Sequence, residues 1–485
     1  MSGVAAPRSS EPSARSARLT LLTASFGTLL VLVDYTSPLT TLTPTAASLG
    51  AGLTAQTWTL TGTLLGLAAL LLTMGSAADD FGRKRVFGAG AVLMLLSTAL
   101  SAAAPNTGIF LTGRVLQGCA GAALLAPSLG LVGHAFPTGP ARIRATGVWG
   151  AAVGLGIAIG PVYAALLEKA AGWRAVYWVL ALLSAVVLLL TVFGVEESRN
   201  ERPRKLDPLG VLTLGAGASC LIAGLAEGRY GWGRTMVVSL LVAGVLLLAA
   251  FVVVESRIPE PMLDLALLRS PGFVVSCSGA LFTGLSIVGL MSYLPTVLQK
   301  SLGQSPLAAS GILAIWSGLS FVAALQARRL ATRVSAISQV AASLLVCGIG
   351  EAALYGMHEG DSWARLVPGL AIAGIGSGVL NAALARLAVA SVPAHRGSMG
   401  SGANNTARYL GSSLGVALTV TLVAQASSSE GPAEATALGA NDAVLAAAAL
   451  CLVGALISLW GRIAERRAER AAGEDAGPAA VKTAA

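Results

Sequence analysis

The sequence predicts an all-α membrane protein with fourteen spans, arranged as two six-helix bundles with two further helices inserted between them. Hydrophobic residues make up 55% of the 485 residues and charged residues only 11%, whereas a soluble domain carries about 25% charged residues. The stretches 35–78 and 86–113 contain no formally charged residue, which leaves room for membrane spans of about 20 residues. A chain of this composition requires lipid as its solvent.

Apolar windows place the fourteen spans. Their ranges are 19–42, 55–75, 86–104, 108–134, 143–167, 175–195, 208–226, 235–255, 272–298, 306–326, 334–357, 364–390, 404–425 and 441–460. The segment 196–207 is the most polar internal stretch, so it ends the first bundle, and the pair of spans within 208–255 is the insertion. The expected divisions are a tail, the first bundle, a linker with the two inserted spans, the second bundle and a second tail, at 1–18, 19–195, 196–271, 272–460 and 461–485.

The distribution of positive charge predicts the orientation in the membrane. Of the 32 Lys and Arg residues, 23 fall on the tails and on the loops of one side, and six fall on the loops of the other side. Cytoplasmic loops carry the excess of Lys and Arg, so we expect both termini in the cytoplasm of a bacterial inner membrane. The net charge of +9 follows the span ends, not one soluble face, which argues against a nucleic-acid partner. Residues 1–18 show no secretory signal.

The five cysteines and three histidines are widely spaced, so they predict neither a disulfide framework nor a metal site. The chain also lacks a G-x-x-x-x-G-K-[ST] phosphate loop and any evident pairing of a nucleophile with a base. We therefore expect neither an enzyme nor a cofactor, and we expect the proton gradient to supply the energy.

A dense cluster of charge lies at 75–85, between the second and third spans, and reads GSAADDFGRKR. Its notable residues are Gly75, Asp79, Gly82, Arg83, Lys84 and Arg85. Gly82 permits a positive φ at the chain reversal, and the carboxylate of Asp79 favours a helix N-terminus. Such a loop can hold two helix ends together and release them, as the inner gate of a transporter requires. The alternative is a loop whose positive charge only fixes the topology.

Asp34 lies about fifteen residues into the first span, and a carboxylate at that depth costs several kcal/mol unless it is paired, hydrated or protonated. A rise of about 1.5 Å per residue puts Arg114 of the fourth span at a matching depth, and Gln117 follows one turn later. We expect Asp34 to bind and release a proton, with Arg114 and Gln117 tuning it. The alternatives are an Asp34 held by Ser or Thr hydroxyls and an Arg114 that extends to the outer interface.

The fifth span contains a glycine-rich stretch that ends in a proline. The residues concerned are Gly150, Gly154, Gly156, Gly160 and Pro161. Glycines about four residues apart let helices approach closely, and Pro161 interrupts the backbone hydrogen bonds of its helix. A tightly packed helix that can kink suits a rocking interface, although plain close packing would use the same glycines.

Aromatic and polar side chains within the spans are candidates for lining a substrate cavity. They are Tyr35, Trp149, Tyr293, Trp316, Asn381, Asn404, Asn405 and Arg408. An interfacial position is the alternative for the aromatic residues, and we favour it for Trp58. Glu351, near the outer end of the eleventh span, is either a second titrating site or an interfacial side chain, and we favour the interfacial position.

Taken in order, these motifs resemble those of the 14-span drug:proton antiporters of the major facilitator superfamily over nearly the whole chain. Further segments that look like that family are Trp173-Arg174, GLAEGRYGW at 224–232, YLPTVLQKSLGQSPL at 293–307 and NNTARYLGSSLGVAL at 404–418. Three features depart from the family pattern. Asp80 replaces the basic residue that commonly follows the loop aspartate, Ala164 and Ala165 replace paired glycines, and the tenth span lacks an acid.

The resemblance implies the major facilitator fold, in which a monomer exports an amphipathic small molecule in exchange for protons by alternating access. The cargo would be a drug, an antibiotic or a secondary metabolite. Two alternatives stay open at this point, because the residue pattern does not set the direction of transport. One is a proton-coupled importer or facilitator of the same fold, and the other is a membrane protein that binds a ligand without transporting it.

Overall fold

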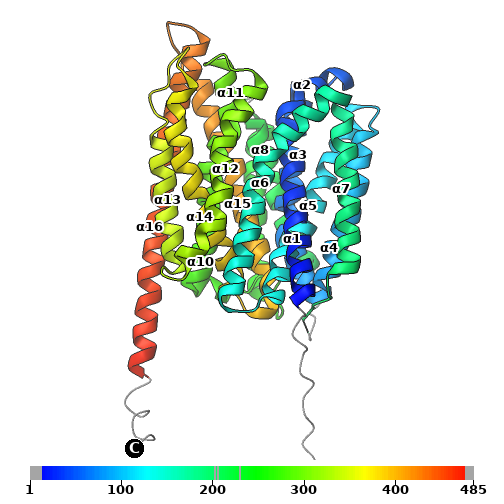
Figure 1. Cartoon of the computed structure of the whole chain (residues 1–485), viewed down its shortest axis with the longest axis vertical. Coiled ribbons are helices and arrows are strands. Elements are labelled where there is room, and N and C mark those ends of the chain that lie inside the picture. Colours follow the sequence, from blue (N-terminus) through cyan, green and yellow to red (C-terminus); the bar gives the residue numbers. More distant parts are fainter. Residues whose placement is uncertain (1–13, 201–203, 205–206, 229–230, 476–485) are drawn as a thin grey trace, which may run out of the picture.

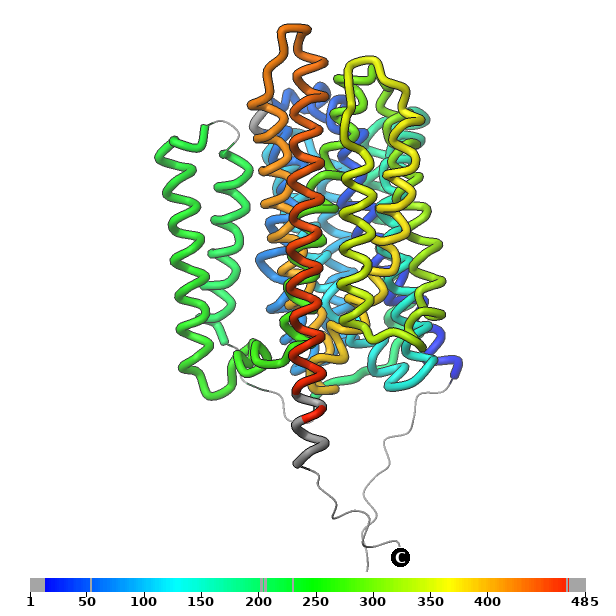
Figure 2. Tube along the Cα trace, turned by 90° about the vertical axis from the view of Figure 1, so that its left-hand side faces the viewer, coloured from blue at the N-terminus to red at the C-terminus, as the bar shows by residue number. Residues whose placement is uncertain are grey.

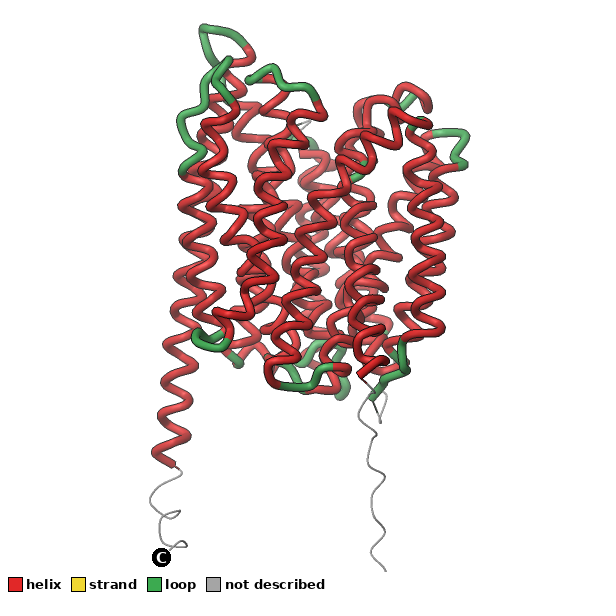
Figure 3. Tube along the Cα trace, in the orientation of Figure 1, coloured by secondary structure: helices red, strands yellow, loops and turns green. Residues whose placement is uncertain are grey.

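The computed structural model describes residues 14–200, 204, 207–228 and 231–475, so the two predicted tails lie partly outside the described residues. Within these ranges every regular element is a helix (Figure 3). Thirteen of the described helices are long and apolar enough to cross a membrane, and Ala336–Ala352 is a shorter apolar helix. Because its 17 residues meet the lower limit of about 17 for a span, this helix completes the predicted set of fourteen.

The first bundle contains seven helices, of which one is a short connector. They are α1 (Ala14–Thr36), the connector α2 (Pro38–Leu49), α3 (Leu53–Phe81), α4 (Arg83–Ala102), α5 (Thr107–Ala135), α6 (Gly139–Ala171) and α7 (Trp173–Gly194). The predicted first span, 19–42, is interrupted, because α1 ends at Thr36 and α2 begins at Pro38. A proline has no backbone N–H with which to continue the preceding helix, which explains the break.

The second bundle also provides six spans. Its elements are α10 (Pro271–Phe282), η2 (Thr283–Val288), α11 (Gly289–Lys300), α12 (Pro306–Ala331), α13 (Ala336–Ala352), α14 (Val367–Ala390), α15 (Gly397–Gln425) and α16 (Pro432–Asp475), with short turns η1 (Leu265–Arg269), η3 (Trp363–Leu366) and η4 (Ala394–Arg396). The first three form one span, in which η2 is a turn of π-helix. The last helix continues well past 460, the predicted end of the final span.

The inserted pair, α8 (Pro208–Gly228) and α9 (Thr235–Arg257), stands at one side of the molecule (Figure 2). α8 packs against both α3 of the first bundle and α15 of the second, and α9 packs mainly against α8. Only 17% of the apolar window of α9 is buried, compared with 83% for α5. α9 therefore presents most of its surface to lipid.

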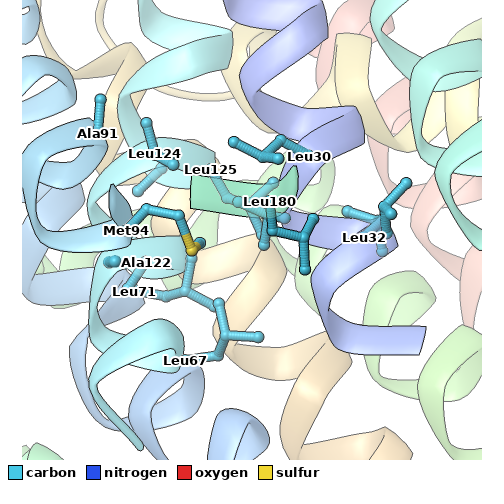
Figure 4. Close-up of a cluster of buried hydrophobic side chains, with 14 of the residues drawn as sticks. Leu30, Leu32, Leu67, Leu71, Ala91, Met94, Ala122, Leu124, Leu125 and Leu180 are labelled. Carbon is cyan, nitrogen blue, oxygen red and sulfur yellow. The ribbon is translucent and has the colours of Figure 1, made fainter. Parts of the chain in front are cut away.

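Each bundle has its own hydrophobic core. The core of the first bundle gathers leucines and small residues from α1, α3, α4, α5 and α7 around Leu67, Leu71 and Met94 (Figure 4). The core of the second bundle includes Leu290 and Leu344. Because lipid tails are as apolar as leucine, close packing more than exclusion of water stabilises such cores.

The start of α1 and the end of α16 lie at the same end of the molecule, as an even number of spans requires (Figure 1). We call this end the terminal end. The loop between α3 and α4 and the beginning of α15 lie there as well, since α3 is the second crossing and α15 the thirteenth.

Candidate functional site

Asp34 of α1, Arg114 of α5 and Gln117 of α5 form one polar cluster inside the first bundle. Arg114 Nη1 donates to Asp34 Oδ1 at 3.2 Å and to Gln117 Oε1 at 2.6 Å. All three residues have a relative exposure of 0%. The structure thus brings these three predicted residues together, with a guanidinium as the partner of the carboxylate. Neither alternative fits, since a guanidinium and not a hydroxyl binds the Asp34 side chain, and Arg114 is fully buried.

Arg114 and Gln117 bind groups outside the cluster, but one atom of Asp34 and one of Arg114 have no partner. Arg114 Nε donates to Thr59 O at 3.2 Å, and Gln117 Nε2 donates to Ser101 Oγ at 3.0 Å. Within the described residues, Asp34 Oδ2 and Arg114 Nη2 are buried and have no hydrogen-bond partner. A buried ion pair gains most when its remaining donors and acceptors are satisfied. This one keeps a carboxylate oxygen with unused capacity for a proton.

A second polar pair lies in the other bundle, and two tyrosines connect it to the first cluster across the boundary between bundles. Arg408 Nη1 of α15 donates to Asn381 Oδ1 of α14 at 2.8 Å. The rings of Tyr35 and Tyr409 meet edge to face with centroids 6.4 Å apart. Since Tyr35 follows Asp34 and Tyr409 follows Arg408, the two charged positions lie on either side of this ring contact.

At the terminal end, the carboxylate of Asp79 caps the first turn of α15. Ser398 N–H donates to Asp79 Oδ1 at 3.1 Å, and Met399 N–H donates to Oδ2 at 2.8 Å. These amides belong to the first helical turn, whose N–H groups lack partners within the helix and attract negative charge. The last turn of α3, which extends beyond the predicted end of the second span at 75, therefore holds the second bundle directly.

Arg83 completes this connection, which we call the clasp and define by Asp79, Arg83, Ser398 and Met399. Arg83 Nη2 lies 2.7 Å from Asp79 Oδ1, and Arg83 Nε donates to Ser398 Oγ at 3.1 Å. Arg83 is only 4% exposed. A Cβ on Gly75 would collide with the backbone carbonyl of Ser398, so the close approach of α3 to α15 requires glycine there.

The other charged residues of the loop contact their own side of the molecule. Lys84 Nζ donates to Val192 O at 2.9 Å, and Arg85 Nε lies 3.6 Å from Glu197 Oε2. Gly82 has a φ of +121°, the conformation that the predicted chain reversal needs. Of the three loop cations, Arg83 alone belongs to the clasp, while Lys84 and Arg85 fasten the loop to the end of α7 and the segment after it.

Asp80, the residue that departs from the family pattern, has a partner that sequence reasoning missed. Arg204 Nη2 donates to Asp80 Oδ2 at 2.9 Å and to Ser76 Oγ at 3.0 Å, and Arg204 also donates to Pro261 O. The sequence did offer a sign of this contact, because the charged segment 196–207 contains several cations and was predicted at the same membrane surface as Asp80. Asp80 thus links the α3–α4 loop to the connection that leads into the inserted pair.

The glycines of the fifth span serve two different contacts of α6. A Cβ on Gly156 would lie 2.6 Å from Leu32 Cβ of α1, and one on Gly160 would collide with Thr36 Oγ1 of α1. On another face, a Cβ on Gly150 would lie 3.2 Å from Ala382 Cα of α14, and one on Gly154 would lie 3.2 Å from the backbone nitrogen of Phe321 in α12. α6 therefore packs closely against α1 and also across the boundary between the bundles.

Pro161 ends this glycine-rich stretch inside α6. Its carbonyl oxygen accepts a hydrogen bond from Thr40 Oγ1 of α2 at 3.1 Å. The connector α2 thus supports α6 at the position where the proline disturbs the regular hydrogen bonding of the helix.

The remaining cavity candidates make hydrogen bonds within their own bundle. Trp149 Nε1 donates to Ser128 Oγ of α5 at 2.9 Å, and Trp316 Nε1 donates to Ser377 Oγ of α14 at 3.2 Å. Asn404 Nδ2 donates to Ser276 Oγ of α10 at 3.0 Å and Asn405 Nδ2 donates to Ser401 O at 3.0 Å, whereas Tyr293 is half-buried. These hydrogen bonds position the helices around the centre of each bundle.

Glu351 is not an interfacial side chain, so that expectation is wrong. The residue is 0% exposed, and Cys451 Sγ of α16 donates to Glu351 Oε2 at 3.4 Å. The reason is that α16 packs along α13 and covers this face. Trp58, for which we favoured the membrane interface, donates from Nε1 to Glu227 Oε1 of α8 at 3.2 Å and so joins α3 to the inserted pair.

Comparisons with known proteins agree with this architecture. The family model described as Major Facilitator Superfamily matches residues 24–416. The chain is 33% identical over 408 residues to the puromycin resistance protein pur8 of Streptomyces alboniger, covering 81% of this chain and 79% of that protein. It is 28% identical over 411 residues to the multidrug resistance protein Stp of Mycobacterium tuberculosis, covering 84% and 76%.

The fold is also similar to that of solved structures. The crystal structure of the human organic anion transporter MFSD10 superimposes with a TM-score of 0.65 at 18% identity, covering 91% of this chain and 99% of that chain. At that identity the likeness shows the fold alone. Because the family model spans most of the sequence and the arrangement of helices agrees with it, the chain belongs to the major facilitator superfamily, as a multi-pass membrane protein whose relatives include drug resistance proteins.

Proposed function

We propose that the protein is a proton-coupled antiporter that exports an amphipathic small molecule, such as a drug, an antibiotic or a secondary metabolite. The observation that carries the proposal is the incomplete ion pair of Asp34 and Arg114, buried in the first bundle. Relatives named for resistance to puromycin and to multiple drugs support export of a small molecule. The basic loops support a bacterial inner membrane with the terminal end in the cytoplasm.

Asp34 would carry the proton. In the ionised form its charge is balanced by Arg114, 3.2 Å away. When a proton binds to Oδ2, the attraction between the two side chains falls, and Gln117 Oε1 keeps one N–H of Arg114 satisfied. Ionisable residues inside a membrane protein commonly serve proton pathways for this reason.

The clasp would act as the inner gate. With Asp79 and Arg83 bound to the first turn of α15, the two bundles are joined at the terminal end. Export requires this side to open for cargo, so the clasp must break once in each cycle. Each proton that moves inward through a membrane potential of 100 mV supplies about 2.3 kcal/mol, which is comparable to the contribution of a charge-assisted hydrogen bond.

The proposal is tested by expression in a bacterial host that lacks its own drug pumps. We expect wild-type protein to raise resistance to some members of a panel that begins with puromycin, and Asp34→Asn to abolish this resistance at equal membrane expression. In everted vesicles, addition of an exported drug to energised wild-type membranes should release protons, seen as recovery of the fluorescence of a quenched acridine dye.

Glu227→Gln is the matched control, because Glu227 is also a carboxylate near the membrane but belongs to the inserted pair. It should keep both the resistance and the proton release. Resistance that survives in Asp34→Asn would refute proton coupling at this residue. Drug uptake into cells that is driven by the proton gradient would instead identify an importer.

A further inference from the structure

Arg408 is a buried cation that pairs with a neutral amide. It lies eleven residues after the start of α15 at Gly397, about 16 Å along the helix axis, and it is 8% exposed. Its side chain donates from Nη1 to Asn381 Oδ1 at 2.8 Å, and within the described residues its Nε is buried without a partner. A guanidinium in the middle of a membrane protein is thus left with unused donors.

The two other buried arginines of the described chain, Arg83 and Arg114, each have a carboxylate. Among the half-buried arginines, Arg204 also has a carboxylate, whereas Arg386 is bound to an amide. Arg83 lies 2.7 Å from Asp79, Arg114 lies 3.2 Å from Asp34, and Arg204 lies 2.9 Å from Asp80. Arg408 has none among the described residues. An arginine stays protonated in proteins, and an uncompensated charge at this depth is expensive. The missing negative charge is therefore expected to come from a ligand.

The orientation of the guanidinium fits an oxyanion. Asn381 occupies Nη1, which leaves the edge formed by Nε and Nη2. This edge offers two parallel N–H groups, the geometry that binds both oxygens of a carboxylate. The backbone of α15 at Arg408 packs directly against η2, because a Cβ on Gly284 of η2 would collide with the carbonyl of Arg408.

The surroundings supply apolar surface for the rest of such a ligand. Tyr409, the next residue, meets Tyr35 across the boundary between the bundles, with ring centroids 6.4 Å apart. α15 also packs against α3 and α5 of the first bundle. The Tyr409 ring, one residue along α15 from the buried cation, would supply the apolar surface for the body of such a ligand.

The geometry points to a binding site in which Arg408 and Asn381 hold the anionic group of an amphipathic substrate, a carboxylate, a sulfonate or a similar oxyanion. This inference rests on the proposed function, because it names the class of cargo that the antiporter would export. Export of an anion in exchange for an imported proton would also carry net positive charge into the cell. The membrane potential favours movement in this direction.

Binding to purified full-length protein in detergent tests the site with probes that differ in charge but hardly in shape. The probes are 9-anthracenecarboxylate with its carboxamide, and 1-pyrenebutyrate with its amide, followed by fluorescence polarisation. We expect the wild-type protein to bind at least one carboxylate about tenfold or more tightly than its amide, as a charge-assisted bidentate pair allows. Arg408→Gln should bring the two affinities together.

Asn381→Asp is the sharper variant. It keeps Arg408 and the size of its partner but places a carboxylate 2.8 Å from the guanidinium, so the internal pair should replace the ligand and the preference for anions should disappear. Arg386→Gln is the matched control, because Arg386 of α14 is likewise bound to an amide, that of Gln339. Arg386→Gln should still bind the carboxylate probe more tightly than its amide, as the wild type does.

Equal affinities of wild-type protein for the two members of each probe pair, or binding of none of the four probes, would overturn the inference. So would an Asn381→Asp protein, folded as judged by its size-exclusion profile, that keeps the preference. The measurement uses no proton gradient, so it is separate from the test of coupling. Wild-type protein that prefers carboxylates but releases no protons in vesicles would refute the proposed antiport alone.

Discussion

Tyr35 and Tyr409 touch across the two bundles, with their ring planes inclined at 78°. Each follows a buried charged residue, Asp34 in α1 and Arg408 in α15. The negative position has a guanidinium partner, whereas the positive position has only an amide. The two halves of the protein thus differ in how their buried charges are paired, and the proposed roles, proton handling for the first bundle and ligand binding for the second, rest on this difference.

Removal of Arg114 should destabilise the protein strongly. Arg114→Met leaves the Asp34 carboxylate buried without its cation, and breaking a buried pair from one side costs about 3–5 kcal/mol. Thermal unfolding in detergent, followed with a thiol-reactive dye, measures the loss. The double variant Asp34→Asn/Arg114→Met should recover most of it. A double variant no more stable than Arg114→Met would mean that the pair is not the cause.

Loss of the clasp should open the terminal end. Asp79→Asn weakens the hydrogen bonds from Ser398 and Met399, and a hydrogen bond to a charged group contributes about 1.5–3 kcal/mol. Spin labels on cysteines at the exposed positions Arg144 and Arg329, in a background without native cysteines, should move apart in double electron–electron resonance.

Asp80→Asn is the control for the clasp experiment. Asp80 is paired with Arg204 and not with α15, so the distance distribution between the two labels should match that of the unmutated background. A similar opening in both variants would show that the α3–α4 loop holds the bundles by its overall charge.

The close contact between α6 and α1 predicts a steric effect at one glycine. In Gly156→Ala the new Cβ would lie 2.6 Å from Leu32 Cβ and 2.9 Å from Leu29 O, and overpacking of this kind typically costs about 1–3 kcal/mol. Gly318→Ala in α12 is the control, since nothing lies within 4 Å of its added methyl group. We expect a lower unfolding temperature for the first variant and an unchanged or higher one for the second.

The loop before α14 should loosen in acid. The backbone N–H of His358, and after it the Arg365 guanidinium, hold the pKa of Asp361 below its usual value. Because the folded pKa is lowered, the stabilisation is present above the unfolded pKa of about 3.9 and is lost as the pH falls through the folded pKa. Amide hydrogen exchange in residues 356–366, corrected for the intrinsic rate, should accelerate as the pH falls through the folded pKa of Asp361. In Asp361→Asn this acid-dependent change should disappear.

The helices could be predicted from the sequence because lipid imposes long apolar segments. The break at Pro38 could have been foreseen from proline chemistry, but the apolar run continues past it and hides the boundary. The 17-residue helix Ala336–Ala352 was predicted at 334–357. Its end lies earlier than hydropathy suggests, because residues 353–362 form a loop tied to Asn441 of α16 by hydrogen bonds.

The contact between Asp34 and Arg114 could be predicted by counting residues, since both lie in spans of known direction within one bundle. The partners of Asp79 could not, because Ser398 and Met399 lie 319 and 320 residues away and contribute backbone N–H groups, which any residue carries. The burial of Glu351 depends on how α16 crosses α13, and no local pattern shows which face of a helix another helix will cover.

The contact of α8 with both α3 and α15 has a mechanical consequence. If the two bundles rotate against each other in the proposed transport cycle, α8 must slide along at least one of them. In that cycle the inserted pair would restrain the movement of the bundles on its own side of the molecule, because α8 contacts a helix of each.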